Sequence, residues 1–349
     1  MRWRVGVAID MGTVNTRVCA AGRGLLVDEP SAVAVDRTTG GVIAVGHAAD
    51  ALAGKQAQDV EVIHPLKDGV VADLDAAAAM LQGFLRKAKL GRSPVRSAAV
   101  VCVPGAATSL QRRSLAVVAG APRPRLNVRL IDAPVAAAAG AGFDLAAGAG
   151  GFVVDIGGGH TEAAVLAGGH VVRARSLRAG GSAMDEAIVQ AVKGEMGLLL
   201  GRDAARSLKM TFGLSDSAAA PAEAVGVDAA QRMPRVERVP AALVTGALGQ
   251  AVTAIVGAVR EMLSDIPPNL AADVVRGKIR LVGGGALLPG LAARIEAAAG
   301  IPAVVVDDPL HCTVRGAADA LEPGAGLTFT ERPDTAGYLA PAANENPVL

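Results

Sequence analysis

The stretch VGVAIDMGTVNTRVCA, residues 5–20, decides the fold that this sequence predicts. Its apolar residues 5–9 predict a strand that ends at Asp10, and a polar turn leads from there into a second strand at Arg17. Gly12 lets the backbone approach an anion, and the N–H and hydroxyl groups that follow it point toward such an anion. Asp10 could hold a magnesium ion through water, because this ion keeps much of its hydration shell. The same pattern also describes an ordinary hairpin, so this stretch alone leaves both interpretations open.

A second copy of the pattern begins at Gly151. Another apolar run ends in Asp155, and the turn IGGGHT leads into a new strand that starts at Glu162. Two strand–Asp–glycine–strand units in one chain predict a duplicated fold. We therefore expect one phosphate-binding turn from each half to face a shared cleft, with Asp155 matching Asp10.

A third glycine turn, residues 283–286, follows an expected strand at 278–282 and opens a helix at about Pro289. This arrangement suits close approach of the backbone to a flat ring or a ribose. Each turn taken alone is more readily structural than functional. Together, in this order, the three turns indicate a nucleotide-binding site.

Composition narrows the classes of function. The 349 residues leave room for two domains, with 51% hydrophobic residues, 19% charged residues and a formal net charge of +1. This charge gives no field that attracts nucleic acid, and the 2% of aromatic residues argue against base-stacking surfaces. We expect no nucleic-acid partner.

Cysteines, histidines and apolar runs indicate a cytoplasmic protein. Cys19, Cys102 and Cys312 are odd in number and lack ligand spacing, so we expect buried thiols in a reducing compartment. The histidines are scattered, which predicts no metal cluster. The N-terminus lacks a secretory signal, and we expect no apolar run long enough to span a bilayer.

The chain divides into two halves of alternating strands and helices. Further expected strands are 24–28, 32–35, 42–45, one from residue 60, 98–103, 128–131, 171–177 and 303–306. The expected helices are 48–52, 74–89, 109–119, 135–142, 183–196, 203–210, 241–264, 291–299 and 313–321. Residues 214–240 have weak periodicity and are expected to form a small inserted subdomain. From residue 323 the composition predicts a disordered tail.

The sequence resembles the actin, sugar-kinase and heat-shock-chaperone ATPase superfamily, and within it the MreB-type bacterial actins. The similarity covers about residues 5–322. It is carried by DMGTVNT (10–16), EPSAVAV (29–35), PLKDGV (65–70), VCVP (101–104), DIGGG (155–159), GGGALL (283–288) and DDPL (307–310). The resemblance implies an α/β fold of the actin-like ATPase type, with two duplicated βββαβα (RNase H-like) domains around a nucleotide cleft.

The resemblance also implies boundaries and a site. Residues 1–145 would form the first domain, with a small subdomain at about 30–72. Residues 146–322 would form the second, with a small subdomain at about 183–245, leaving 323–349 as the tail. The cofactors would be ATP and Mg²⁺, the ion being held through water by Asp10 and Asp155. The nucleotide-binding residues would be Asp10, Gly12, Thr13, Val14, Asn15, Thr16, Gly157, Gly158, Gly159, His160, Arg206, Lys209, Gly284, Gly285, Ala286 and Leu287.

Three positions depart from the family's pattern. Ala133 falls on the glutamate that orients the attacking water, and a methyl group can neither polarise nor position water. Asp132 beside it points elsewhere if the helix register holds. His160 replaces a threonine of the second phosphate loop, and Arg206 replaces a glutamate on the adenine side. We hypothesise a member that binds ATP but cleaves it slowly or not at all.

The resemblance implies head-to-tail filaments under the membrane that act with the cell-wall elongation machinery in determining cell shape. Trp3 and residues 84–90 could contact the membrane, although a solvated surface is the simpler interpretation of each. Filaments multiply weak contacts, which keeps peripheral membrane association open. Two alternatives remain: a non-polymerising actin-fold scaffold with weak or vestigial nucleotide binding, and a small-molecule kinase of the same superfamily.

Overall fold

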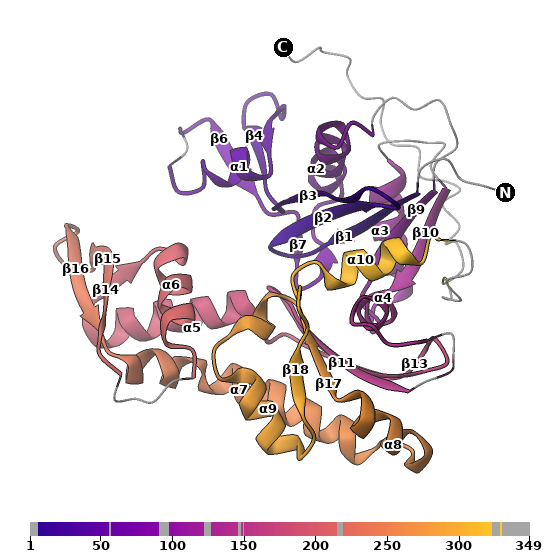
Figure 1. The fold of residues 1–349 in the computed structure, drawn as a ribbon. Coiled ribbons are helices and arrows are strands. Elements are labelled where there is room, and N and C mark those ends of the chain that lie inside the picture. Colours follow the sequence, from indigo (N-terminus) through magenta and orange to yellow (C-terminus); the bar gives the residue numbers. More distant parts are fainter. Residues whose placement is uncertain are drawn as a thin grey trace.

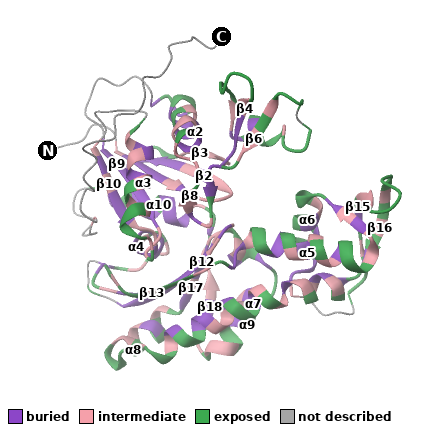
Figure 2. Cartoon of the chain, turned by 180° about the vertical axis from the view of Figure 1, so that it is seen from behind, coloured by how far each residue is buried: buried purple, intermediate pink, exposed green. Residues whose placement is uncertain are grey.

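The computed structural model describes residues 6–55, 57–90, 98–121, 127–145, 148, 150–214, 219–322 and 329. The chain forms two lobes, each built around a five-stranded sheet (Figure 1). The strands at the centre of both sheets are buried, whereas exposed residues gather on the outer helices and hairpins (Figure 2). The predicted tail and Trp3 lie outside the described residues, apart from residue 329.

The first sheet has the strand order β10-β9-β1-β2-β3. Its strands are β1 (Gly6–Met11), β2 (Asn15–Ala20), β3 (Gly24–Pro30), β9 (Ala98–Val103) and β10 (Asn127–Asp132). The first three form antiparallel hairpins, and β9 and β10 run parallel to β1. Parallel neighbours need crossovers, which α2 (Leu74–Lys87) and α3 (Ser109–Gly120) supply. Every residue of β9 is buried, as its continuous apolar run predicts.

The second sheet repeats the first. Its order is β13-β12-β11-β17-β18, with β11 (Gly151–Ile156), β12 (Thr161–Ala167), β13 (His170–Leu177), β17 (Ile279–Val282) and β18 (Ala303–Val305). Again the first three strands are antiparallel and the last two run parallel to the first of them. The same order and the same strand directions in both sheets confirm the predicted duplication.

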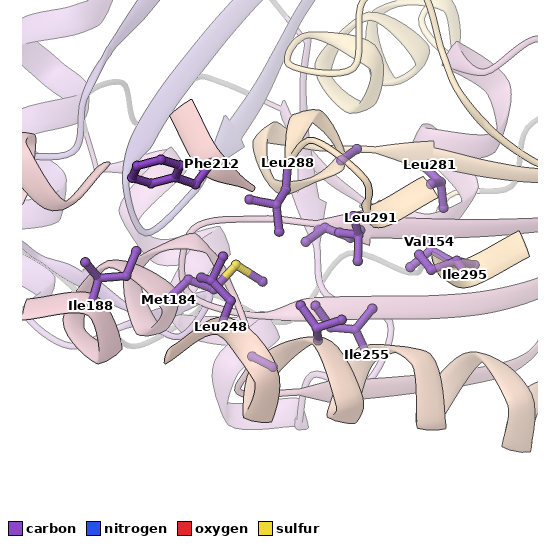
Figure 3. Packing of buried hydrophobic residues seen from close by; sticks show 14 of the residues in the cluster. Val154, Met184, Ile188, Phe212, Leu248, Ile255, Leu281, Leu288, Leu291 and Ile295 are labelled. Carbon is purple, nitrogen blue, oxygen red and sulfur yellow. The ribbon is translucent and has the colours of Figure 1, made fainter. Parts of the chain in front are cut away.

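Helices of the second half build its core. They are α5 (Gly181–Met196), α6 (Arg202–Phe212), α7 (Ala241–Ser264), α8 (Pro268–Gly277) and α9 (Leu291–Ala299). In Figure 3, Val154 and Leu281 of the sheet lie near Leu291 and Ile295 of α9, and Leu248 and Ile255 of α7 lie below them in the view. Removal of this apolar surface from water is the main stabilising term of the lobe.

The last helix of each half packs against the other half. Helix α10 (Cys312–Asp319) lies against β1, β2 and β9 of the first sheet, and α4 (Ala133–Gly140) packs mostly against β11 and β12 of the second. The two helices also pack tightly against each other. Their backbones are so close that a Cβ atom at Gly316 would collide with the carbonyl oxygen of Ala136. A third buried cluster, lined by both helices and both sheets, therefore joins the lobes.

The first half carries two small additional sheets, and the second half carries one. In the first half, β4 (Val33–Asp36), β5 (Val42–Val45) and β6 (Val60–Ile63) pair in the order β5-β4-β6 beside α1 (His47–Asp50), and β7 (Leu66–Lys67) pairs with β8 (Val70–Val71). In the second half, β14 (Leu198–Leu200), β15 (Ala222–Asp228) and β16 (Pro234–Val239) form a sheet in that order. The domain and subdomain boundaries given above stay predictions.

Several elements differ from the sequence-based expectation. The two-residue strands β7 and β8, the strands β14, β15 and β16 and the helix α8 were not foreseen. In the hairpin of β15 and β16, apolar and polar residues alternate only weakly. Val225 and Val236 point outward and are 63% and 60% exposed. The position of the hairpin depends on pairing with β14, which is a tertiary contact and leaves little trace in local periodicity.

Helix α7 corrects the expectation that no apolar run could span a bilayer. By length and composition alone, this helix of 24 residues is long and apolar enough to do so. Its apolar side chains, among them Val244, Leu248 and Ile255, are instead buried in the core of the second lobe. The apolarity of α7 is therefore explained by packing inside the protein.

Residues 84–90 do not offer the apolar surface that a membrane contact needs. Phe84 is fully buried, and Leu85 and Leu90 are less than 10% exposed in the core of the first lobe. Lys87 points to the surface, where its Nζ lies 2.6 Å from Glu29 Oε2. The simpler interpretation of this segment, a helix end with a solvated polar face, therefore replaces the membrane contact.

Candidate functional site

The two acidic hairpins share one turn geometry. In the first, the N–H of Gly12 donates to the carbonyl oxygen of Asn15 at 3.0 Å, and in the second the N–H of Gly157 donates to the carbonyl oxygen of His160 at 3.0 Å. The turn joins β1 to β2 in one lobe and β11 to β12 in the other. The duplication therefore extends from the sheets to single hydrogen bonds.

The three glycine turns line one cavity of about 390 Å³, a volume typical of small-molecule sites. Residues from both lobes lie on its wall. Of the residues singled out in the sequence, the cavity is lined by Asp10, Gly12, Thr13, Val14, Asn15, Ala133, Asp155, Gly157, Gly158, Gly159, His160, Arg206, Lys209, Gly284, Gly285 and Leu287. The structure thus places Asp10 and Asp155 in the same crevice.

Two of the predicted contact residues do not line the cavity. Thr16 is fully buried behind the first turn, where its Oγ1 lies 2.8 Å from Oγ of Ser31. Ser31 in turn donates to the carbonyl oxygen of Gly12 at 2.7 Å, so Thr16 supports the turn from behind. Ala286 is buried in the core of the second lobe. Side chains alternate between the faces of a strand, which is why Thr16 points away from the cavity while its neighbours line it.

Asp10 and Asp155 form the acidic part of the cavity wall. Burial raises the pKa of Asp10 to about 6 against the opposing charge of Arg17, and the negative charge of Asp155 adds to the rise. Burial also raises the pKa of Asp155, although Thr313 Oγ1 donates to its Oδ2 at 3.1 Å. Two partly buried carboxylates whose pKa values are raised and that line one cavity are a donor set whose charge a hard divalent cation compensates. These residues fit a magnesium ion bound through water.

In the described part of the chain, no group of three or more His, Cys, Asp or Glu residues is arranged to hold a metal ion. Mg²⁺ commonly binds through one or two carboxylates, its own waters and the phosphates of a substrate. A bound magnesium ion would supply positive charge next to the phosphates.

A buried ion pair closes the side of the cavity formed by α5 and α6. Lys209 Nζ lies 2.6 Å from Asp185 Oδ1, with both side chains less than 10% exposed, and also donates to the carbonyl oxygen of Gly181 at 3.0 Å. Arg206, at the more exposed rim, lies 3.8 Å from Asp185. Asp185 was not foreseen as a site residue, because it lies 24 positions before Lys209 and only the fold pairs them.

The third glycine turn has a conformation that requires glycine. Gly283 has a φ of 79°, and a Cβ atom there would collide with Oδ1 of Asp155. The turn continues as a 3₁₀ helix, η1 (Gly284–Leu287), and α9 begins at Leu291. The helix expected from about Pro289 is thus preceded by a tighter turn, which holds the backbone against the second acidic hairpin.

Ala133 lines the cavity with a methyl group at the position where the resemblance places a water-orienting glutamate. The neighbouring carboxylate does not replace it, because Asp132 Oδ1 lies 2.7 Å from Arg112 of α3. The prediction that Asp132 points elsewhere is confirmed.

Glu162 is a cavity residue that the sequence analysis described only as the start of a strand. It is 2% exposed, and its Oε1 accepts a hydrogen bond from the N–H of Ala106 at 3.1 Å, which links β12 to the loop after β9. Burial raises its pKa to about 7, although backbone hydrogen bonds from Gly105 and Ala106 oppose the rise. The signal available in the sequence was its position, seven residues after Asp155 as Arg17 is seven after Asp10.

Residues from both lobes meet near His160. The ring of His160 packs over Gly69, where a Cβ atom would lie 2.5 Å from its Cε1. Thr13 Oγ1 accepts a hydrogen bond from the N–H of Gly69 at 2.9 Å. Burial lowers the pKa of His160, although the charges of Asp10 and Asp68 oppose the fall. The tip of the second turn is thus held against residues 68–69 of the first half.

Other residues that the sequence analysis did not name as contacts also line the cavity. They are Arg17, Asp28, Gly69, Cys102, Pro104, Leu115, Gly181, Ser182, Met184, Met210, Gly283, Leu288, Pro309, Leu310 and Thr313. Most belong to motifs quoted for the resemblance or follow them directly, but nothing in the local pattern says which side chains face the cavity.

Duplicated sheets, paired acidic turns and a cavity between them define a protein with the actin-like fold. The family model described as MreB/Mbl protein matches residues 4–327. The chain is 38% identical over 327 residues to the cell shape-determining protein MreB of Escherichia coli K12, covering 90% of this chain and 93% of that protein. This chain belongs to the MreB/Mbl family.

Two further comparisons agree with this assignment. The cell shape-determining protein Mbl of Bacillus cereus is 33% identical over 318 residues, covering 90% of this chain and 95% of the relative. The crystal structure of MreB5 of Spiroplasma citri bound to AMPPNP has a TM-score of 0.82 and 28% identity, covering 90% of this chain and 95% of that one. The predicted actin-like fold is confirmed.

Proposed function

We propose that this protein binds ATP with Mg²⁺ in the cavity between its lobes and assembles into filaments that help determine bacterial cell shape. The observation that carries the proposal is the convergence of three glycine turns and two partly buried acids, Asp10 and Asp155, on one cavity. Two features of relatives support it: the MreB5 structure is bound to AMPPNP, and the curated relatives are named cell shape-determining proteins.

Within this proposal the chain's own residues have distinct tasks. The N–H groups of residues 12–15 and 157–160 and the hydroxyl of Thr13 would bind phosphates, and Asp10 and Asp155 would hold the magnesium waters. The Lys209–Asp185 pair with Gly284, Gly285 and Leu287 would contact the nucleoside. Because Ala133 has no group that orients water, hydrolysis would be slow. The filaments would lie in the cytoplasm on the inner membrane face and act with the cell-wall elongation machinery.

Nucleotide binding is tested by thermal melting with and without Mg-ATP. A ligand that binds only the folded state raises stability by about 2.7 kcal/mol at a concentration 100 times its Kd. We expect the melting midpoint to rise with ATP and magnesium together and to rise less with ATP alone. Asp155→Asn should reduce the magnesium-dependent part. An unchanged midpoint in the wild type would favour the scaffold with vestigial binding.

Assembly is tested by pelleting and electron microscopy of the purified chain with and without Mg-ATP. We expect filaments above a critical concentration. Phosphotransfer to sugars, in the absence of pelleting, would instead indicate a kinase.

A further inference from the structure

Thr313 connects the last helix of the chain to an acid of the cavity wall. It is the second residue of α10, it is 6% exposed and it lines the cavity. Its Oγ1 donates to Oδ2 of Asp155, near the end of β11, at 3.1 Å. The two residues are 158 positions apart in the sequence, so only the fold brings the hydroxyl to the carboxylate.

The position of Thr313 in the first turn of α10 leaves its hydroxyl available. Inside a helix, a threonine hydroxyl often donates to the carbonyl oxygen four residues earlier. For Thr313 that residue is Pro309, which precedes the helix, and its carbonyl oxygen accepts a hydrogen bond from the N–H of Gly283 at 2.8 Å. The hydroxyl of Thr313 therefore donates to the carboxylate of Asp155 and not to its own backbone.

The other oxygen of Asp155 is confined as well. A Cβ atom at Gly283 would collide with Oδ1 of Asp155, so the backbone of the third glycine turn lies directly beside this oxygen. The carboxylate is thus held between that turn and α10, and it has little room to rotate. Among the described residues, no comparable hydrogen bond reaches the carboxylate of Asp10. Of the two acids, Asp155 is the one whose orientation the fold fixes.

The helix that carries Thr313 is itself held in place. Cys312 Sγ donates to the carbonyl oxygen of Ala137 of α4 at 3.4 Å. One turn later, Gly316 leaves no space between α10 and the backbone of α4. A group on a helix that is fixed by packing holds a functional side chain more precisely than a group on a loop. Thr313 therefore presents its hydroxyl to the carboxylate from a fixed position.

We propose that Thr313 is the positioning residue of Asp155, because its hydroxyl fixes the carboxylate in the orientation in which it holds the waters of a magnesium ion. The hydrogen bond from Thr313 uses one of about four lone-pair sites of the carboxylate, so acceptor sites remain for water. Thr313 acts only through Asp155. Removal of a group that orients a metal ligand commonly lowers metal affinity by about 10- to 100-fold. This role rests on the nucleotide and magnesium binding proposed above.

Crystal structures of the full chain without nucleotide test the positioning itself. Thr313→Val removes the hydroxyl and keeps the shape of the side chain, whereas Thr313→Ser keeps the hydroxyl. We expect one orientation of the Asp155 carboxylate in the wild type and in Thr313→Ser. In Thr313→Val we expect the carboxylate to rotate or to occupy more than one orientation. The same single orientation in all three proteins would overturn the proposal.

The role toward magnesium is tested by measuring the Kd of ATP in EDTA and in saturating Mg²⁺. The ratio of the two values measures how much the ion adds to affinity. We expect Thr313→Val to reduce this ratio by about tenfold and to leave the Kd in EDTA unchanged. Thr313→Ser should retain the ratio of the wild type. Thr245→Val is the matched control, because it removes a hydroxyl of α7 that has no partner among the described residues.

Two outcomes of the ATP measurements would overturn the proposal. One is an unchanged ratio in Thr313→Val, and the other is a loss of affinity of the same size in EDTA and in Mg²⁺. If the wild type binds no ATP in either solution, the proposed function fails. The crystal structures then still decide whether Thr313 positions Asp155.

Discussion

At the scale of single residues, the cavity wall combines charges that burial makes costly. Lys209 and Asp185 compensate each other, Asp10 and Asp155 do not, and Glu162 relies on backbone N–H groups. Buried charges without a partner destabilise a fold and are retained where a ligand uses them. The effect of these charges on the stability of the protein is therefore linked to their role in ligand binding. Variants at single positions test the two effects separately.

Lys209→Met should destabilise the protein by about 3–5 kcal/mol, because it leaves Asp185 buried without its partner. The free energy of unfolding in urea measures the loss. The double variant Lys209→Met with Asp185→Leu should recover much of it, since no unpaired charge then remains. A loss under about 1 kcal/mol for the single variant would show that Arg206 or water compensates the charge of Asp185.

Glu162→Gln should change the pH dependence of stability. The folded-state pKa of about 7 lies above the ordinary 4.5, so the wild type is fully stabilised only below pH 4.5 and loses stability as pH rises toward 7. The loss is about 3 kcal/mol at most. Relative to the wild type, the variant should gain stability between about pH 5 and about pH 8 in urea unfolding. Parallel curves for the two proteins would contradict this.

Ala133→Glu should raise the rate of phosphate release from ATP by about a hundredfold, because a carboxylate can then orient water at the cavity wall. A coupled phosphate assay measures the rate. Ala133→Gln is the matched control, since it adds a side chain of the same length without a base. An equal rate in all three proteins would argue against position 133 as the cause of slow hydrolysis.

At the scale of elements, the contact between α4 and α10 joins the lobes through glycine. Gly316→Ala would place a methyl group against the carbonyl oxygen of Ala136, and overpacking against the backbone costs about 1–3 kcal/mol. Thermal melting should show a lower midpoint. Gly246→Ala, in α7 with no atom within 4 Å of the new Cβ, should leave the midpoint unchanged or raise it, because alanine favours helix. Equal shifts in both variants would contradict the role of the helix contact.

At the scale of the whole molecule, two lobes share one cavity and are joined by the packed helices α4 and α10. In the proposed filaments, many copies also present their surfaces together. Contacts too weak to hold one chain on a membrane then become sufficient, because linked contacts add as avidity.

Binding to anionic vesicles should therefore follow assembly. We expect co-sedimentation with vesicles to rise steeply above the critical concentration for filaments, and Trp3→Ala to reduce it without changing filament yield. Linear binding below that concentration would indicate a membrane contact within the single chain. If the same amount of Trp3→Ala protein co-sediments with vesicles, the membrane contact lies on another surface.

Much of the fold was predictable because its signals are local. The buried strand at residues 98–103, the helix at 241–264 and the two acidic turns are all marked by apolar runs and glycines in short windows. The hairpin of β15 and β16 was missed, since its placement depends on pairing with β14, a strand of three residues. Most of the predicted cavity residues line the cavity, whereas Thr16 and Ala286 face inward because the strand and the turn set their direction.

The sequence by itself determined the duplicated α/β architecture, the paired acidic turns and the alanine at position 133. These follow from the order of residues within short segments, where periodicity and turn chemistry act. Only the tertiary structure decided that Glu162 is a cavity wall residue, that Asp185 pairs with Lys209 and that Thr313 donates to Asp155. Each of these joins residues far apart in the chain, and such contacts arise from packing of the lobes, which no local pattern encodes.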